Sequence, residues 1–221
     1  SAGTGDRGTR FNAAFATGGQ AGDVGYGAVC AALTVEQMSG VTIDDFAVVD
    51  FVGFERMVDA IGGVPMTIAE PMNDDLANLH LEAGDQVLNG QQALALARAR
   101  KSLGDGSDIG RIDRQQELLT AMVTQLLTKR NLLTDTPALI QFLDAVTSSL
   151  TTSSGLGDLW TIAGLATSLS GVSTENINFS TIPFDYSGNV VVQNSDADEV
   201  WEKLIADLPV EDEVPVTTDA G

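Results

Sequence analysis

The sequence predicts an α/β fold, and two observations support that class. Apolar residues recur at helical spacing over 24–38, form a strand-like run over 46–51, mark a short helix over 54–61, and form a second run over 64–68. Such alternation is typical of α/β domains. The 221 residues are 43% hydrophobic, which is enough for one sizeable core. We therefore expect an α/β/α sandwich with a central mixed sheet, flanking helices and an apolar cavity.

Glycines punctuate the elements of the first half. Residues 1–22 are Gly-rich and are expected to be loop, apart from a short segment over 10–15. The helix over 24–38 should end at Gly40, because glycine readily adopts the left-handed conformation that closes a helix. The pair Gly62 and Gly63 should stop the next helix in the same way.

The middle of the chain reads as a turn region between two helices. Residues 79–90 are expected to form a short hairpin or turn, and an Ala- and Leu-rich helix should follow over 91–99. A polar loop over 101–110 then leads into a long helix over 111–128.

The last part of the chain is expected to add helices, strands and a tail. Two helices are predicted over 137–150 and 157–169, and we expect them to form one wall of the apolar cavity. Two strands are predicted over 177–182 and 189–192, joined through residues 186–188. A closing amphipathic helix is predicted over 196–208. Residues 1–209 then form one domain, and 210–221 a flexible acidic tail.

Charge and composition exclude several classes of function. The chain has 31 acidic and 11 basic residues and a net charge of −20, which disfavours nonspecific binding to nucleic acid. The single cysteine, Cys30, cannot form an intrachain disulfide and is expected to be buried. No apolar run approaches the length that crosses a bilayer. We expect a membrane anchor or export signal upstream of Ser1.

Basic residues cluster in one short stretch of this acidic chain. Five of the eleven lie close together, namely Arg98, Arg100, Lys101, Arg111 and Arg114. Arginine suits phosphate recognition because its planar guanidinium is always charged and donates in a fork. The cluster therefore favours an anion site, and the alternative is a set of solvated helix ends paired with nearby aspartates.

The predicted helix over 111–128 adds a polar-to-apolar stripe. Arg111, Gln115, Leu118 and Met122 recur at intervals of four, three and four residues, so they share one face. A helix start attracts anions, and the stripe suits a ligand with a pyrophosphate head and a hydrocarbon tail. An amphipathic core helix produces the same apolar end without a lipid. Asp108 is expected to cap this helix, to take part in chemistry, or to do both.

The motif over 93–100 and the segment over 108–116, Asp-Ile-Gly-Arg-Ile-Asp-Arg-Gln-Gln, resemble the signature of the LytR-CpsA-Psr family. Further segments that resemble the family lie at 10–19, 49–64, 81–94 and 182–183. The similarity therefore covers residues 9–209.

The resemblance implies a role for each site residue. Arg98, Arg100, Arg111 and Gln115 occupy positions that hold a carrier pyrophosphate. The remaining candidates are the acidic loop residue Asp108, the rim residue Arg10, and the substrate-binding residues Arg114, Leu118 and Met122. Family domains begin earlier, with strands whose aspartates bind Mg²⁺, so we expect the metal ligands in an N-terminal part and none among these residues. Either a companion fragment supplies that part, or this chain alone cannot catalyse transfer.

The resemblance also implies an extracytoplasmic, membrane-anchored transferase of the cell envelope. Such an enzyme moves a glycopolymer from a polyprenyl-pyrophosphate carrier to a peptidoglycan acceptor, and arabinogalactan, teichoic acid and capsule are all open as the polymer. Two alternatives are a non-catalytic polyprenyl-phosphate-binding module and a pyrophosphatase acting on the same carrier. Phosphate-loop, zinc and serine-elbow motifs are absent from the sequence, and His80 is expected to be a surface residue.

Overall fold

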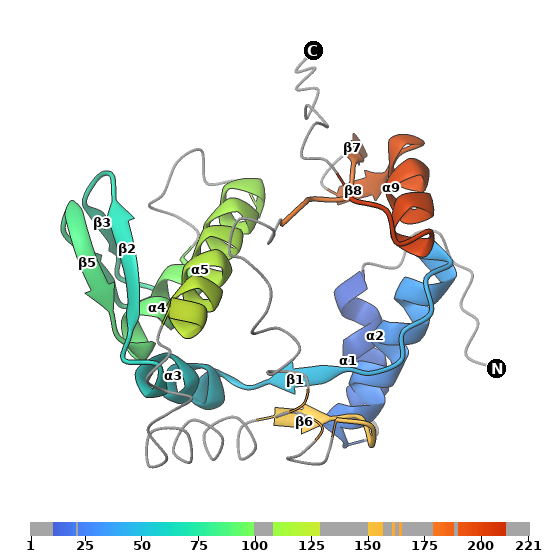
Figure 1. Ribbon diagram of the computed structural model, residues 1–221, viewed down its shortest axis with the longest axis horizontal. Helices are drawn as coiled ribbons and strands as arrows, with labels where there is room; N and C mark the ends of the chain where they lie inside the picture. Colours follow the sequence, from blue (N-terminus) through green and yellow to red (C-terminus); the bar gives the residue numbers. More distant parts are fainter. Residues whose placement is uncertain are drawn as a thin grey trace. The chain divides into compact units, whose positions relative to one another are not determined.

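The chain forms two compact units in the computed structural model (Figure 1). Unit 1 comprises Ser1–Val48, Thr152–Leu156 and Asn178–Gly221, and unit 2 comprises Val49–Thr151 and Gly157–Ile177. The structure describes residues 11–20, 22–99, 108–128, 150–156, 161, 164, 179–187 and 190–210. The expected helices over 137–169, apart from these few positions, and the expected tail over 211–221 lie outside the described residues.

The mixed helix and strand composition confirms the α/β class. The strands pair as β1–β6, β2–β5, β3–β4 and β7–β8, each pair forming a two-stranded sheet. The described strands therefore do not form the single central sheet that is expected from the sequence. Strand β1 is Ala47–Val49, β2 is Val64–Ile68 and β6 is Leu150–Thr152, so these strands are three to five residues long.

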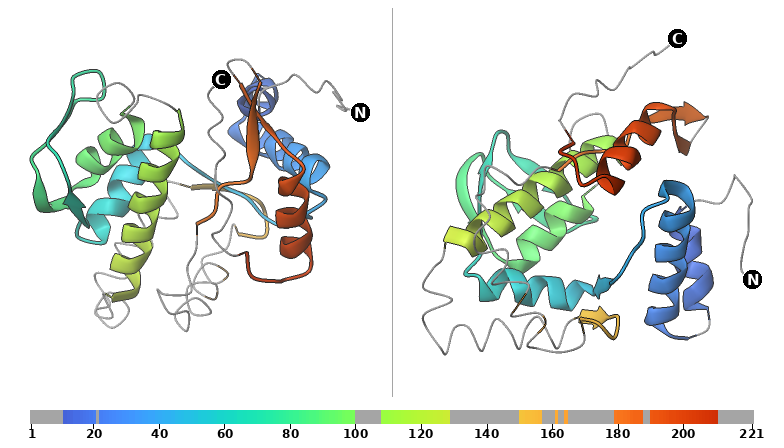
Figure 2. Two further views of the ribbon diagram at one scale, coloured as in Figure 1. Left: turned by 90° about the horizontal axis from the view of Figure 1, so that it is seen from above. Right: turned by 45° about the vertical axis from the view of Figure 1, so that its right-hand side comes forward.

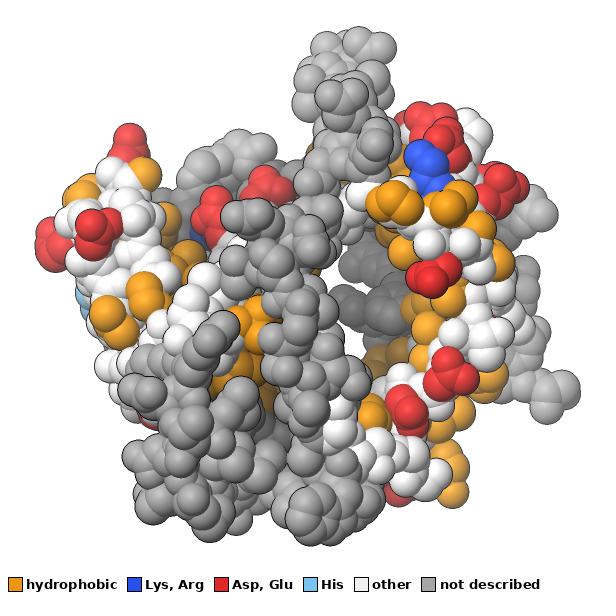
Figure 3. All heavy atoms as spheres, in the orientation of Figure 1, with side chains coloured by type: hydrophobic (Ala, Val, Ile, Leu, Met, Phe, Trp, Pro, Cys, Tyr) orange, Lys and Arg blue, Asp and Glu red, His pale blue; other side chains and the backbone are white. Residues whose placement is uncertain are grey.

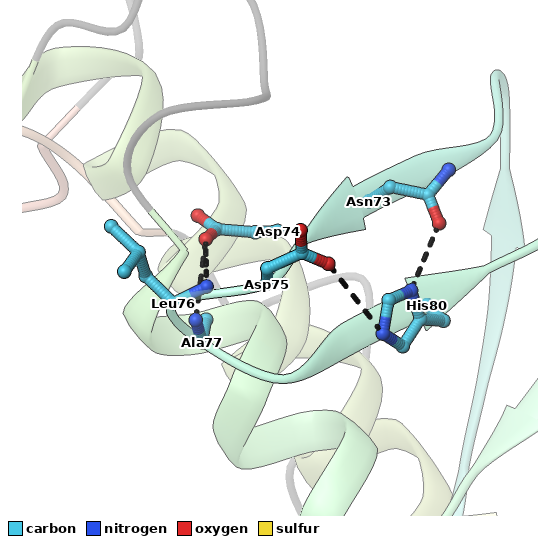
Figure 4. A network of polar contacts seen from close by, with 6 residues as sticks. All are labelled: Asn73, Asp74, Asp75, Leu76, Ala77 and His80. Carbon is cyan, nitrogen blue, oxygen red and sulfur yellow. Dashed lines mark hydrogen bonds and ion pairs between the residues drawn. The ribbon is translucent and has the colours of Figure 1, made fainter.

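A side-chain turn places the hairpin earlier in the chain than expected (Figure 4). Asp74 Oδ1 accepts hydrogen bonds from the backbone nitrogens of Leu76 and Ala77, at 3.0 and 3.2 Å. This turn pairs β3 (Met72–Asp74) with β4 (Leu79–Leu81). A hairpin confined to 79–90 is therefore wrong, because β5 (Gly84–Leu88) pairs antiparallel with β2 instead.

Unit 2 is built around the β2–β5 sheet and three helices (Figure 2). The helices are α3 (Phe51–Ala60), α4 (Gly90–Arg98) and α5 (Asp108–Thr128). They share one hydrophobic core, whose largest fully buried side chains are Leu79, Leu88, Leu96, Leu118, Val58 and Val64. This core positions α4 between α3 and α5, and α4 carries the first arginine of the basic cluster.

A cap residue shortens the first expected strand. Asp50 Oδ1 accepts a hydrogen bond of 2.6 Å from Gly53 N, which starts α3 at Phe51. The strand expected over 46–51 therefore ends at Val49. The apolar run alone does not show this, because its last residue belongs to the helix.

Unit 1 contains a pair of packed helices. The helix α1 (Phe11–Gly19) extends beyond the expected segment over 10–15, and α2 (Val24–Ser39) follows it closely. Asp23 caps α2 through Gly25 N, and Gly40 closes it with a φ of 71°, as expected for a glycine. A β-carbon on Gly27 would lie 2.9 Å from the carbonyl oxygen of Phe15, so a small residue is needed where the helices meet.

The end of unit 1 forms a hairpin and a helix. Strand β7 (Phe184–Ser187) pairs antiparallel with β8 (Val190–Gln193). The strand expected over 177–182 is wrong for its described residues, 179–182, because the observed strand begins at Phe184. Tyr186 is a paired residue of β7, so it is not part of the turn expected to join the two strands, and its ring lies edge-to-face with the ring of Phe184. The closing helix α9 (Asp196–Ile205) confirms the expected amphipathic segment.

Charge on α9 follows the helix dipole. Acidic residues occupy its first turn, and Lys203 lies in its last. Lys203 Nζ lies 2.8 Å from Glu199 Oε1, and this hydrogen bond, with the charge of the ammonium, lowers the pKa of Glu199. Figure 3 shows acidic side chains spread over the described elements of the visible face, in line with the net charge of −20. Among the described helices, none combines the length and the apolar character of a bilayer-crossing segment.

The contact between α3 and α4 predicts a severe effect of Gly90→Ala. A β-carbon at Gly90 would lie 2.7 Å from Glu55 Cα and still closer to its carbonyl oxygen. Because both atoms are backbone, α4 must shift, and we expect a loss of about 1–3 kcal/mol in urea unfolding. Gly19→Ala is the control, since nothing lies within 4 Å of its β-carbon. Equal stability of the two variants would contradict this packing.

Candidate functional site

The N-terminal end of α4 is held by two sets of hydrogen bonds. Asn89 Oδ1 accepts from Gln92 N at 2.9 Å, and Gln92 Oε1 accepts from Asn89 N at 3.0 Å. This capping box satisfies donors that have no partner within the helix. In addition, Gly90 N donates to Asp59 Oδ1 on α3 at 2.8 Å. The start of α4 is therefore fixed to α3.

The C-terminal end of α4 is held by side chains of α5. Ala99 leaves the helix in an extended conformation and is fully buried. Gln115 Nε2 donates to Ala97 O at 2.9 Å, and Arg114 Nη2 donates to Ala99 O at 3.1 Å. The last carbonyls of a helix have no partner within it and carry partial negative charge. The amide and the guanidinium of α5 supply the donors that these carbonyls need.

Arg98 lies in the last turn of α4, between the two carbonyls that α5 binds. Its guanidinium carbon is 4.7 Å from the centroid of the Phe51 ring, within the range of a cation–π contact. The ion pairs among the described residues involve His80 with Asp75 and Lys203 with Glu199. Within this part of the chain, no carboxylate neutralises Arg98, which suits a residue that meets an anion.

Arg114 has a structural contact as well as a predicted role in substrate binding. One terminal nitrogen binds Ala99 O, while Nε is buried and has no hydrogen-bond partner among the described residues. A buried donor of this kind costs free energy. The side chain is half-buried, so part of it is accessible to a ligand, and its role in substrate binding stays a prediction.

The start of α5 carries the second part of the predicted site. The helix includes Asp108 as its first residue, three residues before the start at Arg111 that is expected from the sequence. Arg111 precedes Gln115 by one turn of α5, a spacing that places two residues on one face of a regular helix. The side chains of Asp108 and Arg111, and the whole of Arg10, Arg100 and Lys101, lie outside the described residues.

The apolar end of the stripe belongs to the core of unit 2. Leu118 is 2% exposed, and Met122 is partly buried against the same cluster. This is the arrangement of an amphipathic core helix. Contact of Leu118 or Met122 with a hydrocarbon tail stays a prediction.

Two features of the site were missed by sequence reasoning. The sequence gives only a weak indication of Phe51, which is an aromatic residue directly after the capping Asp50 and is exposed at the start of α3. The carbonyls of Ala97 and Ala99 have none, because any residue carries a backbone carbonyl.

The described residues also define what lies outside this site. His80 is 60% exposed in its side chain, as expected, and its Nδ1 lies 3.1 Å from Asn73 Oδ1 (Figure 4). In the described ranges, no group of three or more histidine, cysteine, aspartate or glutamate side chains is arranged to hold a metal ion.

Comparisons with known proteins agree on one family. The model of the LytR_cpsA_psr family matches residues 2–207. Cell wall biosynthesis protein LcpA of Corynebacterium glutamicum is 35% identical over 164 residues, covering 71% of this chain and 30% of LcpA. The polyisoprenyl-teichoic acid–peptidoglycan teichoic acid transferase TagV of Bacillus subtilis is 34% identical over 129 residues, covering 56% and 31%. The chain thus spans about a third of the length of these curated relatives.

Solved structures show the same fold. The crystal structure of B. subtilis TagV has a TM-score of 0.68 at 23% identity, covering 94% of this chain and 79% of that one. A LytR-Csp2A-Psr enzyme from Actinomyces oris has a TM-score of 0.63 at 23% identity, covering 74% and 64%. At these identities the likeness concerns the fold alone.

The bond from α5 to α4 predicts a loss of stability in Gln115→Leu. Leucine keeps a similar volume but leaves Ala97 O without its donor, so we expect a loss of about 1 kcal/mol in urea unfolding. Gln125→Leu is the matched control on the same helix. Its Nε2 donates to Ile61 O over a longer 3.3 Å, so its loss should be smaller. A neutral Gln115→Leu would show that this bond does not hold α4.

Proposed function

The chain belongs to the LytR_cpsA_psr family, and on that premise we propose that it transfers a cell-wall glycopolymer from a polyprenyl-pyrophosphate carrier to peptidoglycan. The relatives support this class: one is a cell wall biosynthesis protein, and another is a teichoic acid transferase. We also propose an extracytoplasmic location in the cell envelope, with the whole protein anchored in the membrane. Arabinogalactan and teichoic acid are both candidate polymers.

The observation that carries the proposal is the arrangement at the end of α4. Arg98 is held on Phe51 and is not neutralised by a described carboxylate. Arg111 lies one turn of α5 before Gln115, the residue that binds Ala97 O. Two arginines from packed helices suit a pyrophosphate, because guanidinium groups bind phosphate oxygens in a fork.

The proposed reaction is a phosphoryl transfer. A muramic acid hydroxyl forms a bond to the phosphorus next to the sugar, and the bond from that phosphorus to the polyprenyl phosphate breaks. The polyprenyl phosphate leaves with the bonding electrons, and a carboxylate, for which Asp108 is the candidate, accepts the hydroxyl proton. Positioning and neutralisation of phosphate charge supply most of the rate enhancement in such reactions.

The proposed division of labour follows the contacts. Arg98, Arg100 and Arg111 bind the pyrophosphate, with Arg10 at the rim of the pocket. Gln115 can contribute to both structure and binding, because its amide nitrogen has two hydrogens and Ala97 O accepts only one. Arg114 supports the α4 terminus at Ala99 O.

We propose Mg²⁺ as the cofactor, with its ligands outside the described residues. The described residues do not fit it, because they contain no cluster of three candidate ligands. A bound Mg²⁺ would neutralise phosphate charge. The arginines act on the same charge through their own donors, so their role does not depend on where the metal lies.

The proposal predicts that Arg111→Ala loses transfer while the fold is kept. A charge-assisted contact contributes about 1.5–3 kcal/mol, which corresponds to a fall of roughly 10- to 150-fold in rate if it is made in the transition state. Arg111→Lys should restore only part, since an ammonium lacks the fork. The measurement is transfer from a polyprenyl-pyrophosphate donor to peptidoglycan by the intact protein, with thermal unfolding in parallel.

The control is Arg56→Ala, an exposed arginine of α3 outside the cluster, which should transfer normally. Normal transfer by Arg111→Ala would remove this residue from the mechanism. Release of the glycan to water without transfer would instead identify a pyrophosphatase, and carrier binding without turnover would identify a binding module.

A further inference from the structure

The ring of Phe51 has an unusual position for a large apolar side chain. It is 59% exposed, at the first residue of α3, and contributes little to the core of unit 2. Asp50 fixes this position by capping the helix through Gly53 N. The ring's charged neighbour is Arg98, whose guanidinium carbon lies 4.7 Å from the ring centroid.

An aromatic ring holds a cation without neutralising it. Its face attracts the guanidinium through the ring quadrupole, whereas a carboxylate would cancel the charge and occupy its donors. The backbone of Arg98 is fixed independently, because Ala97 O and Ala99 O on either side are bound by α5. The hydrogen bonds to Ala97 O and Ala99 O fix the backbone of Arg98 but leave its side chain able to rotate, and the Phe51 ring contacts that side chain.

We propose that Phe51 is a positioning residue, which holds the Arg98 guanidinium in the orientation that binds a phosphate of the substrate. This inference rests on the proposed function, since it assumes that Arg98 binds the carrier pyrophosphate. Phe51 acts through Arg98 and not on the ligand. It reduces the rotamer freedom that a long arginine side chain loses on binding.

The test is the dissociation constant of geranylgeranyl pyrophosphate for the intact protein, measured by calorimetry. Phe51→Leu should weaken binding by about two- to fivefold, the range of an exposed cation–π contact. Phe51→Tyr keeps an aromatic face and should bind as the wild type does. Thermal stability should stay unchanged in both, because the ring is exposed. Val52→Ala is the control, at the next residue of α3 and 57% exposed.

A double-mutant cycle separates a role through Arg98 from a direct one. Arg98→Ala should weaken binding strongly, and Phe51→Leu should add nothing in that background. If Arg98→Ala binds normally, the proposed pyrophosphate site is wrong. If Arg98→Ala weakens binding while Phe51→Leu has no effect, the positioning role alone is overturned. It is also overturned if Phe51→Leu weakens binding equally without Arg98, or if Phe51→Tyr behaves like Phe51→Leu.

Discussion

The carbonyl groups at the C-terminal end of α4 must find donors, and the rest of the site depends on how they do so. Arg114 and Gln115 of α5 bind Ala99 O and Ala97 O. These bonds join α4 to α5 on either side of Arg98, in the last turn of α4. With the start of α4 fixed to α3 through Asp59, both ends of a nine-residue helix are held by side chains of its neighbours.

This arrangement relates the charge of the chain to its function. In a protein with a net charge of −20, an anionic substrate needs a local basic site. The described contact of the Arg98 guanidinium is with a neutral ring, so under the proposed function its charge would be available to phosphate. Arg114 instead binds the partial negative charge of a helix end. Neighbouring arginines of one cluster thus have different contacts, and composition alone does not distinguish them.

Much of the helical structure could be predicted from periodicity and helix-ending residues. The helices α2, α4 and α9 lie close to their expected ranges, and Gly40 closes α2. Strand pairing could not be predicted, because the turn that pairs β3 with β4 depends on one carboxylate, Asp74. The basic cluster of the proposed site is visible in the sequence, and its binding of substrate stays a prediction. Its contacts are not visible there, since they use backbone carbonyls and a ring distant along the chain.

Under the proposed function, α4 and α5 present arginines to one pyrophosphate. The decisive measurement is a crystal structure of the intact protein with geranylgeranyl pyrophosphate. We expect phosphate oxygens within hydrogen-bond distance of both the Arg98 and Arg111 guanidinium groups, with Arg98 still beside Phe51 and Gln115 still bound to Ala97 O. A pyrophosphate bound away from α4, or contacting neither arginine, would contradict it.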